Sequence, residues 1–331
     1  MVLAGDVGGT KTRLGLFDVK GGRLKPLVEE TFPSREHTSL DEIVRQFVSK
    51  HKSRARRACF GVAGPVRRER CETTNLAWVV DARQLAEGLG IETVTLINDL
   101  EANAYGISVL ERKDFAVING GAKDAEGNGA VIAAGTGLGE AGLYWDGARH
   151  RPFACEGGHA DFAPHNELEV ELFRYLQGKF GHVSWERVLS GPGLQNIYEF
   201  LRDTGQGDEP KSIAQEMVEG NPAAVISQAA LAGSCELCVK ALDLFVSLYG
   251  AEAGNLALKV MATGGVYIGG GIAPKIEHKL TDGIFLKAFV DKGRFKPFID
   301  NIPVCIILNE KTALLGTAIH AVLTAPEPEI R

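Results

Sequence analysis

Two short glycine-rich segments each follow an apolar run and carry residue types that bind phosphate. The first runs from Gly5 to Thr10 and contains Asp6, and the second runs from Ala134 to Gly139. Backbone N–H groups in tight glycine turns form concavities that bind anions without a lysine-bearing loop. A carboxylate beside such a turn can hold a Mg²⁺ ion that travels with a nucleotide, directly or through water. From spacing alone, Asp6 could equally serve to form the turn and not to bind a metal ion.

A third glycine cluster comprises Gly264-Gly265 and Gly269 to Gly271, just before Ile272-Ala273-Pro274. Glycine allows a backbone to approach a flat ligand such as adenine, and a mobile loop is the alternative. The chain holds 40 glycines in 331 residues, about 12% against a usual value of about 7%. That excess fits several tight turns or close approaches to a ligand.

Asp99 is a candidate general base. It follows the apolar run Val94 to Ile97 and precedes a helical pattern, which places it at the carboxyl end of an expected strand. Open α/β sheets bind their ligands at such ends. Phosphoryl transfer to an alcohol requires a carboxylate near the attacking hydroxyl. Position alone favours a different role for Asp99, that of a helix N-cap.

Glu156 and His159 flank two glycines, so a tight backbone can present both side chains to one ligand. Carboxylate, imidazole and amide groups donate and accept hydrogen bonds in the pairs that a sugar offers. A metal site that adds His165 is the alternative, but no Cys or His set of metal-binding spacing accompanies these residues. The lone C-x-x-C of Cys235 and Cys238 lies in a helical apolar stretch, which favours buried thiols.

Alternating strands and helices must position these residues, and this alternation predicts the α/β class. Strands are expected at 2–4, 12–18, 59–62, 94–97, 130–134, 142–146, near 260 and at 304–308, with helices at 40–48, after 99, from 167 to about 259 and from 311. The helix after 99 should bury Leu100, Ala104 and Ile107. Gly9 and Gly137 occupy similar strand–turn–strand hairpins 128 residues apart, which predicts a duplicated architecture with a cleft between two halves.

Composition bounds the function. At roughly 100–200 residues per domain, 331 residues predict two domains or one large one. A net charge of −6 argues against nucleic-acid or anionic-membrane partners. No leader segment and no apolar run of roughly 18 residues is seen. Six scattered cysteines without a secretion signal predict reduced thiols and a cytoplasmic protein.

Two motifs that resemble known nucleotide sites lack the required context. Gly5 to Thr12 nearly matches the lysine-bearing phosphate loop, but Thr10 replaces its second glycine and a strand pattern follows. Gly137 to Gly142 is a literal G-x-G-x-x-G, yet an aromatic strand pattern follows it in place of the helix that a dinucleotide site needs.

Five motifs in order along nearly the whole chain resemble the bacterial glucokinase family. They are Gly5 to Thr10, Leu96 to Asp99, Ala134 to Gly139, Glu156 to His159 and Gly269 to Pro274. The resemblance implies the two-domain, ribonuclease H-like fold of the actin-like ATPases with an interdomain cleft. It also implies transfer of the ATP γ-phosphoryl group to the 6-hydroxyl of glucose. The domains would be 1–109 plus about 309–331, and 110–308, with the helix from Lys311 crossing back.

The resemblance also assigns residues. It implies Asp99 as the catalytic base and a sugar site of Asn75, Asn98, Asp99, Glu156, His159 and Glu186. The two glycine hairpins would hold the phosphates from both sides, and the implied ATP-binding residues are Gly5, Asp6, Val7, Gly8, Gly9, Thr10, Gly135, Thr136, Gly137, Gly269, Gly270 and Gly271. Asp6 would bind Mg²⁺, directly or through water. No structural zinc is expected, because the Cys-rich motif of some relatives is absent, and relatives suggest a homodimer.

Three alternatives stay open beside this interpretation. A hexose kinase of broader specificity would share every motif. A sugar-independent ATPase switch of the same fold would not need Asn98-Asp99 or Glu156 to His159. A sugar-sensing repressor would need a DNA-binding extension before the first hairpin, and Gly5 leaves no room for one in this sequence.

Overall fold

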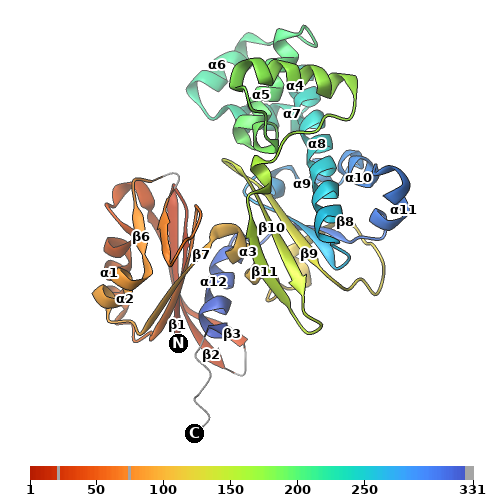
Figure 1. Ribbon diagram of the computed structural model, residues 1–331. Helices are drawn as coiled ribbons and strands as arrows, with labels where there is room; N and C mark the ends of the chain where they lie inside the picture. The colour runs from red at the N-terminus through yellow and green to blue at the C-terminus, as the bar shows by residue number, and fades with distance from the viewer. Residues whose placement is uncertain (21–22, 74–75, 325–331) are drawn as a thin grey trace. The chain divides into compact units, whose positions relative to one another are not determined.

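The computed structural model describes residues 1–20, 23–73 and 76–324 and divides into two compact units (Figure 1). Unit 1 comprises Met1–Glu111 and Asn309–Arg331, and unit 2 comprises Arg112–Leu308. Each unit is a mixed β-sheet with helices packed on it, which confirms the α/β class. Within the described residues, no helix has both the length and the apolar character needed to cross a lipid bilayer.

Unit 1 is built on a five-stranded sheet of order β3-β2-β1-β4-β7. Its strands are β1 (Val2–Val7), β2 (Lys11–Lys20), β3 (Arg23–Pro33), β4 (Arg57–Val62), β5 (Arg70–Glu72), β6 (Val79–Asp81) and β7 (Thr93–Asn98), and its helices are α1 (Leu40–His51), α2 (Ala82–Leu89), α3 (Asp99–Ile107) and α12 (Thr312–Leu323). Strands β1, β2 and β3 are antiparallel neighbours, whereas β1, β4 and β7 run parallel. Strands β5 and β6 form a separate hairpin.

Alternating side chains of β1 build two core layers in unit 1. Leu3 and Val7 belong to the apolar cluster that includes α1 and α2, whereas Val2 and Ala4 belong to the cluster that includes α3 and α12. Successive residues of a strand point to opposite faces, so a fully apolar strand needs helices on both sides. The apolar run from Val2 to Ala4 therefore suits the central place of β1 in the sheet.

Helices α3 and α12 approach each other closely through small residues. A Cβ atom on Gly316 would stand 1.7 Å from the Ala102 carbonyl oxygen, and one on Gly106 would stand 2.0 Å from the Thr312 carbonyl oxygen. The buried residues of α3 are Ala102, Ala104 and Gly106. Of the expected buried face, Ala104 is confirmed, whereas Leu100 and Ile107 are only partly buried, because the close approach of α12 favours the smallest side chains over the most apolar ones.

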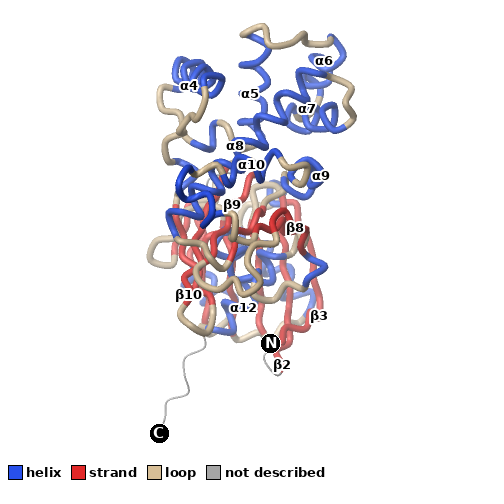
Figure 2. Tube along the Cα trace, turned by 90° about the vertical axis from the view of Figure 1, so that its right-hand side faces the viewer, coloured by secondary structure: helices blue, strands red, loops and turns tan. Residues whose placement is uncertain are grey.

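Unit 2 is built on a six-stranded sheet of order β11-β10-β9-β12-β13-β8. Its strands are β8 (Phe115–Asn119), β9 (Gly129–Ala134), β10 (Leu138–Trp145), β11 (His150–Cys155), β12 (Gly265–Gly269) and β13 (Val304–Ile307), and its helices are α4 (Glu167–Phe180), α5 (Gly191–Asp203), α6 (Lys211–Glu219), α7 (Pro222–Leu231), α8 (Glu236–Val260), α9 (Glu277–Leu280), α10 (Ile284–Val290) and α11 (Lys296–Ile299). The long helix α8 is buried along most of its length. Helices α4 to α7 form a helical lobe of unit 2, in which α5 and α7 pack on α8 (Figure 2).

The two sheets repeat one plan. In both, three antiparallel strands are followed by two parallel ones, as β3-β2-β1-β4-β7 and as β11-β10-β9-β12-β13. Strand β9 begins 127 residues after β1, and β10 begins 127 residues after β2. This repeat is one residue shorter than the 128 that separates Gly9 from Gly137. Strand β10 also starts at Leu138 and not near Gly142, so the G-x-G-x-x-G string lies mostly inside a strand, as expected of a sequence that opens no helix.

Candidate active site

In unit 1, the first glycine turn and Asp99 emerge from the same edge of the sheet. Val7, Val62 and Asn98 are aligned neighbours at the carboxyl ends of the parallel strands β1, β4 and β7. Neighbouring strands lie about 4.8 Å apart, so the backbones of Val7 and Asn98 are roughly 10 Å apart. The turn after Val7 and the aspartate after Asn98 therefore lie within reach of one nucleotide and its acceptor.

The first glycine turn, Gly8 to Thr10, is held by β2 and by the segment after β3. The Gly8 N–H donates to the Lys11 carbonyl over 3.0 Å, and the Ser34 hydroxyl donates to the Gly8 carbonyl over 2.8 Å. The Ser34 N–H donates to the Thr10 carbonyl over 3.0 Å. These bonds fix the turn before any ligand arrives. The earlier part of the motif, Gly5 to Val7, is strand β1.

Asp6 lies one residue inside β1, opposite Arg13 of β2. Burial raises the pKa of Asp6 from 3.8 to about 6, although the positive charge of Arg13 opposes this rise. Arg13 itself forms an ion pair with Glu310, with 2.9 Å between Nη2 and Oε2. A divalent cation beside Asp6 would favour the ionised carboxylate, because an opposite charge stabilises the charged form.

The donor chemistry at Asp6 fits Mg²⁺ bound together with a nucleotide. Mg²⁺ in phosphate-transferring sites typically takes one or two carboxylates and completes its shell with phosphates and water. Across the described part of the chain, no three His, Cys, Asp or Glu side chains gather closely enough to hold a metal ion by themselves. His165 pairs with Glu169, with 3.3 Å between Nδ1 and Oε2, so its interactions lie with α4.

Asn98, and not Asp99, is the N-cap of α3. The Asn98 Oδ1 atom accepts the Leu100 N–H over 2.8 Å, and its Nδ2 donates to the Gly64 carbonyl over 3.3 Å. Asp99 is the first residue of the helix, and its Oδ1 also accepts the Leu100 N–H, over 3.0 Å. The partial positive charge at a helix N-terminus stabilises a carboxylate there. Asn98 therefore caps the helix, and Asp99 follows it as the first helical residue, with an ionisable side chain.

The β5–β6 hairpin approaches Asp99 from its own unit. Burial raises the pKa of Cys71 in β5, and the charges of Asp99 and Glu72 raise it further. The Cys71 Sγ also stands 3.0 Å from where a Cβ of Gly64 would lie. Sequence patterns gave no sign that this thiol stands near the candidate base. Asn75, which follows β5, lies outside the described residues.

In unit 2, the second glycine turn is contacted by Glu186. The turn, Gly135 to Gly137, joins β9 to β10, and the Gly135 N–H donates to the Gly137 carbonyl over 2.8 Å. Oε2 of Glu186 accepts the Leu138 N–H over 3.0 Å. A Cβ on Gly137 would stand 2.4 Å from that same oxygen. Glycine at 137 is thus required by the carboxylate that packs against the turn.

The segment from Glu156 to His159 forms a tight 3-10 turn on β10. A Cβ on Gly158 would stand 2.1 Å from the Leu138 carbonyl oxygen, and a Cβ on Gly157 would also clash with β10. The side chains of Glu156 and His159 are exposed. The two glycines therefore let the backbone lie flat while the flanking polar groups face solvent.

This turn is joined to the segment that carries Glu186. The Trp185 N–H donates to the Ala160 carbonyl over 3.0 Å, and Asp161 forms a β-bridge with Ser184. Unit 2 thus brings Glu156, His159 and Glu186 into one local region, beside the second glycine turn.

The third glycine cluster packs against the end of β9. Gly270 has a φ of +83°, and a Cβ there would stand 2.3 Å from the Ala134 carbonyl oxygen. Tyr249 of α8, which is fully buried, accepts the Ala134 N–H over 3.1 Å; its hydroxyl lies 3.3 Å from the Ile132 carbonyl and 3.4 Å from that of Gly269. This tyrosine ties together the ends of β9 and β12, and sequence patterns did not single it out.

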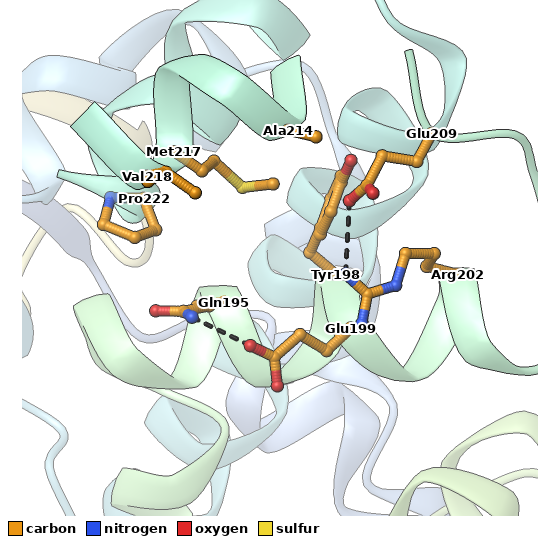
Figure 3. Close-up of a pocket in the computed structure, with 9 residues that line it drawn as sticks. All are labelled: Gln195, Tyr198, Glu199, Arg202, Glu209, Ala214, Met217, Val218 and Pro222. Carbon is orange, nitrogen blue, oxygen red and sulfur yellow. Dashed lines mark hydrogen bonds and ion pairs between the residues drawn. The ribbon is translucent and has the colours of Figure 1, made fainter. Parts of the chain in front are cut away.

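A separate surface cavity of about 320 Å³ lies in the helical lobe and contains none of the predicted site residues (Figure 3). Its carboxylates are already paired. Glu209 accepts from Arg202 over 3.2 Å, and Glu199 accepts from Gln195 over 2.8 Å. This cavity is therefore separate from the predicted site residues.

The two sheets follow one plan, with glycine turns at corresponding strand ends, and a carboxylate lies beside the first turn. Together these features define a class of proteins. This class is the ATP-dependent sugar kinases of the actin-like ATPase fold. A family model described as glucokinase matches residues 3–324. The chain belongs to the glucokinase family.

Individual relatives agree with this assignment. A glucokinase from Nostoc sp. is 44% identical, with 97% of this chain and 98% of that protein aligned. The crystal structure of a glucokinase from an Antarctic psychrotroph superposes with a TM-score of 0.84 at 30% identity, over 98% of this chain and 99% of that one. A ROK family glucokinase from Streptomyces griseus, solved with glucose and AMPPNP, shares the fold, with a TM-score of 0.65 at 22% identity over 97% and 99% of the two chains.

Proposed function

We propose that this chain transfers the γ-phosphoryl group of ATP to the 6-hydroxyl of glucose and releases glucose 6-phosphate and ADP. The observation that carries the proposal is the shared sheet edge in unit 1, where Val7, Val62 and Asn98 align and the first glycine turn and Asp99 emerge. Membership of the glucokinase family supports glucose as the acceptor.

Asp99 is proposed as the catalytic base. Asp99 lies at the first turn of α3, and its carboxylate can accept the proton of the attacking 6-hydroxyl and orient that oxygen. Asn98 is proposed to contact the sugar with the hydrogen-bonding capacity that its cap leaves over. Its amide has a second N–H group, and its Oδ1 has a second lone pair.

The remaining sugar contacts are proposed for Glu156, His159 and Glu186 of unit 2, and for Asn75. The exposed side chains of Glu156 and His159, on a rigid turn fixed to β10, support this role. The Oε2 of Glu186 is occupied by the Leu138 N–H. A sugar hydroxyl would therefore bind its other carboxylate oxygen.

The phosphate groups are proposed to bind Gly8 to Thr10 and Gly135 to Gly137, with Gly269 to Gly271 beside the adenine. Backbone N–H groups in such turns favour anions. Asp6 is proposed to hold Mg²⁺, which would neutralise charge on the phosphates of ATP. Exclusion of water from the bound substrates would protect ATP from hydrolysis.

The test is ADP formation by wild type, Asp99→Asn and the matched control Glu101→Gln. Glu101 lies in the same first turn of α3 and loses the same charge. Asp99→Asn should lower kcat by about 100-fold or more, the usual contribution of a general base, while glucose still binds. Glu101→Gln should retain most of the wild-type kcat. Equal losses in both variants would assign the effect to helix electrostatics and reject Asp99 as the base.

The same assay separates the alternative functions. A sugar-independent ATPase switch would release ADP at the same rate with and without glucose. A broader hexose kinase would show similar kcat/KM for mannose, fructose and glucose. The proposal predicts strong dependence on glucose and a clear preference for it.

We also propose a homodimer and a cytoplasmic location. All six cysteines are free thiols, which suits a reducing compartment. Light scattering after size-exclusion chromatography should give about twice the 35.5 kDa mass of one chain. A single-chain mass at micromolar concentration would reject the dimer.

A further inference from the structure

A buried cluster of charged groups lies directly beneath the turn that carries Glu156 and His159. Glu140 of β10 is 2% exposed, and Glu252 of α8 is fully buried. Both oxygens of Glu252 have partners: Lys259 Nζ at 3.0 Å from Oε1 and Asn255 Nδ2 at 2.8 Å from Oε2. Among the described residues, Oε1 of Glu140 has no hydrogen-bond partner. Glu252 therefore has a donor at each carboxylate oxygen, whereas Oε1 of Glu140 has none among the described residues.

The carboxyl group of Glu140 fills the space beside Gly157. A Cβ on Gly157 would stand 1.9 Å from Oε2 and 2.7 Å from the carboxyl carbon of Glu140. Glu140 is also the ladder partner of Cys155, the residue just before Glu156. The Gly157 part of the turn therefore packs directly against the Glu140 side chain.

Glu140 carries an electrostatic cost when it is ionised. Burial and the neighbouring charge of Glu252 raise the pKa of Glu140 to about 8, and Lys259 opposes this rise. Lys259 is already bonded to Glu252, and like charges at close range disfavour ionisation of both carboxylates. The other groups facing this cluster are Tyr249 of α8, Cys155 of β11 and, next to Glu252, Lys292.

We propose that neutral Glu140 is a positioning residue for the turn from Glu156 to His159, and that its ionisation weakens glucose binding. An ionised Glu140 would be repelled by Glu252, and a shift of its carboxyl group, whose Oε2 lies against Gly157, would displace that residue. Glu156 and His159 would then lose their alignment. This inference rests on the proposed sugar-binding role of Glu156 and His159, and it lies wholly within unit 2.

The first measurement is the Kd of glucose from pH 6.5 to 9.5 by isothermal titration calorimetry. If only the neutral form binds tightly, the apparent Kd scales inversely with its population. Between pH 7 and pH 9 the Kd should then rise about tenfold, while the KM for ATP changes little. A flat wild-type profile would overturn the proposal. Glucose-dependent ADP formation at pH 7, measured first, keeps this outcome separate from failure of the proposed function.

Variants assign the titration to Glu140. Glu140→Gln should match wild type at pH 7 and stay flat to pH 9.5, because the amide cannot ionise. Glu252→Gln should move the rise to lower pH, because it removes the charge that disfavours ionisation of Glu140. Cys155→Ser should keep the tenfold rise. A rise that persists in Glu140→Gln or disappears in Cys155→Ser would overturn the proposal. Thermal melting checks folding, and the Glu252→Gln shift remains decisive if Glu140→Gln is unstable.

Discussion

Replacing Asp6 by asparagine should stabilise the folded chain at neutral pH and impair its use of Mg²⁺–ATP. Burial raises the pKa of Asp6 from 3.8 to about 6. Below pH 3.8 both the folded and the unfolded chain keep the proton. Between pH 3.8 and 6 only the unfolded chain releases it, so stability falls as the pH rises. Above pH 6 the folded chain carries the full cost of a poorly solvated carboxylate.

The size of this cost follows from the shift. About two pKa units at about 1.4 kcal/mol each give an upper limit of about 3 kcal/mol. In urea unfolding, the stability difference between Asp6→Asn and wild type should grow from about 1.5 kcal/mol at pH 5 to about 3 kcal/mol at pH 7.5. Asp41→Asn, at an exposed ion pair on α1, should change stability by no more than about 0.5 kcal/mol.

Mg²⁺–ATP should reverse the order of stability. Ligand binding stabilises the folded state by mass action, and wild type should gain more than Asp6→Asn if this carboxylate holds the metal. The kcat/KM for Mg²⁺–ATP should fall in the variant. The reasoning would be refuted by an Asp6→Asn protein that is no more stable than wild type at pH 7.5, or by a difference that does not change with pH.

Three further substitutions test the packing around the strand ends. Gly137→Ala should displace Glu186, whose Oε2 packs against this glycine. The KM for glucose should rise about tenfold, since losing one charge-assisted hydrogen bond between Glu186 and the sugar costs about 1.5–3 kcal/mol. A KM within twofold of wild type would contradict this contact. Tyr249→Phe leaves the buried Ala134 N–H without its partner, and urea unfolding should show a loss of about 1–3 kcal/mol. Gly316→Ala forces a Cβ onto the backbone of α3, and circular dichroism should show a lower Tm, whereas an unchanged Tm would disprove the close approach.

Local patterns in the sequence predicted the strands and turns that carry the chemistry. The runs at 59–62, 94–97 and 130–134 are strands because each is apolar and bounded by polar or glycine residues. The two glycine turns were predicted because glycines stand between two runs that form paired strands. Such features depend on residues that are close in the chain, so a single sequence shows them.

The sequence did not show which of two neighbouring residues takes a given structural role. Position suggested a cap role for Asp99, yet Asn98 is the cap, because its side chain also reaches the Gly64 carbonyl of a distant segment. The buried face of α3 consists of its smallest residues, because Gly316 and Thr312 of α12 pack against it. Each outcome was decided by a partner far away in sequence.

The sequence by itself determined the α/β class, the glycine turns, the polar residues that follow strands and, through five ordered motifs, the glucokinase family. Tertiary structure alone decided that Val7 and Asn98 end on one sheet edge and that Tyr249 joins the ends of β9 and β12. It also decided that Glu140 is buried beside Glu252, the carboxylate that binds Lys259. Periodicity reports which residues are apolar, whereas the cost of burying a charge depends on the groups that the fold places around it.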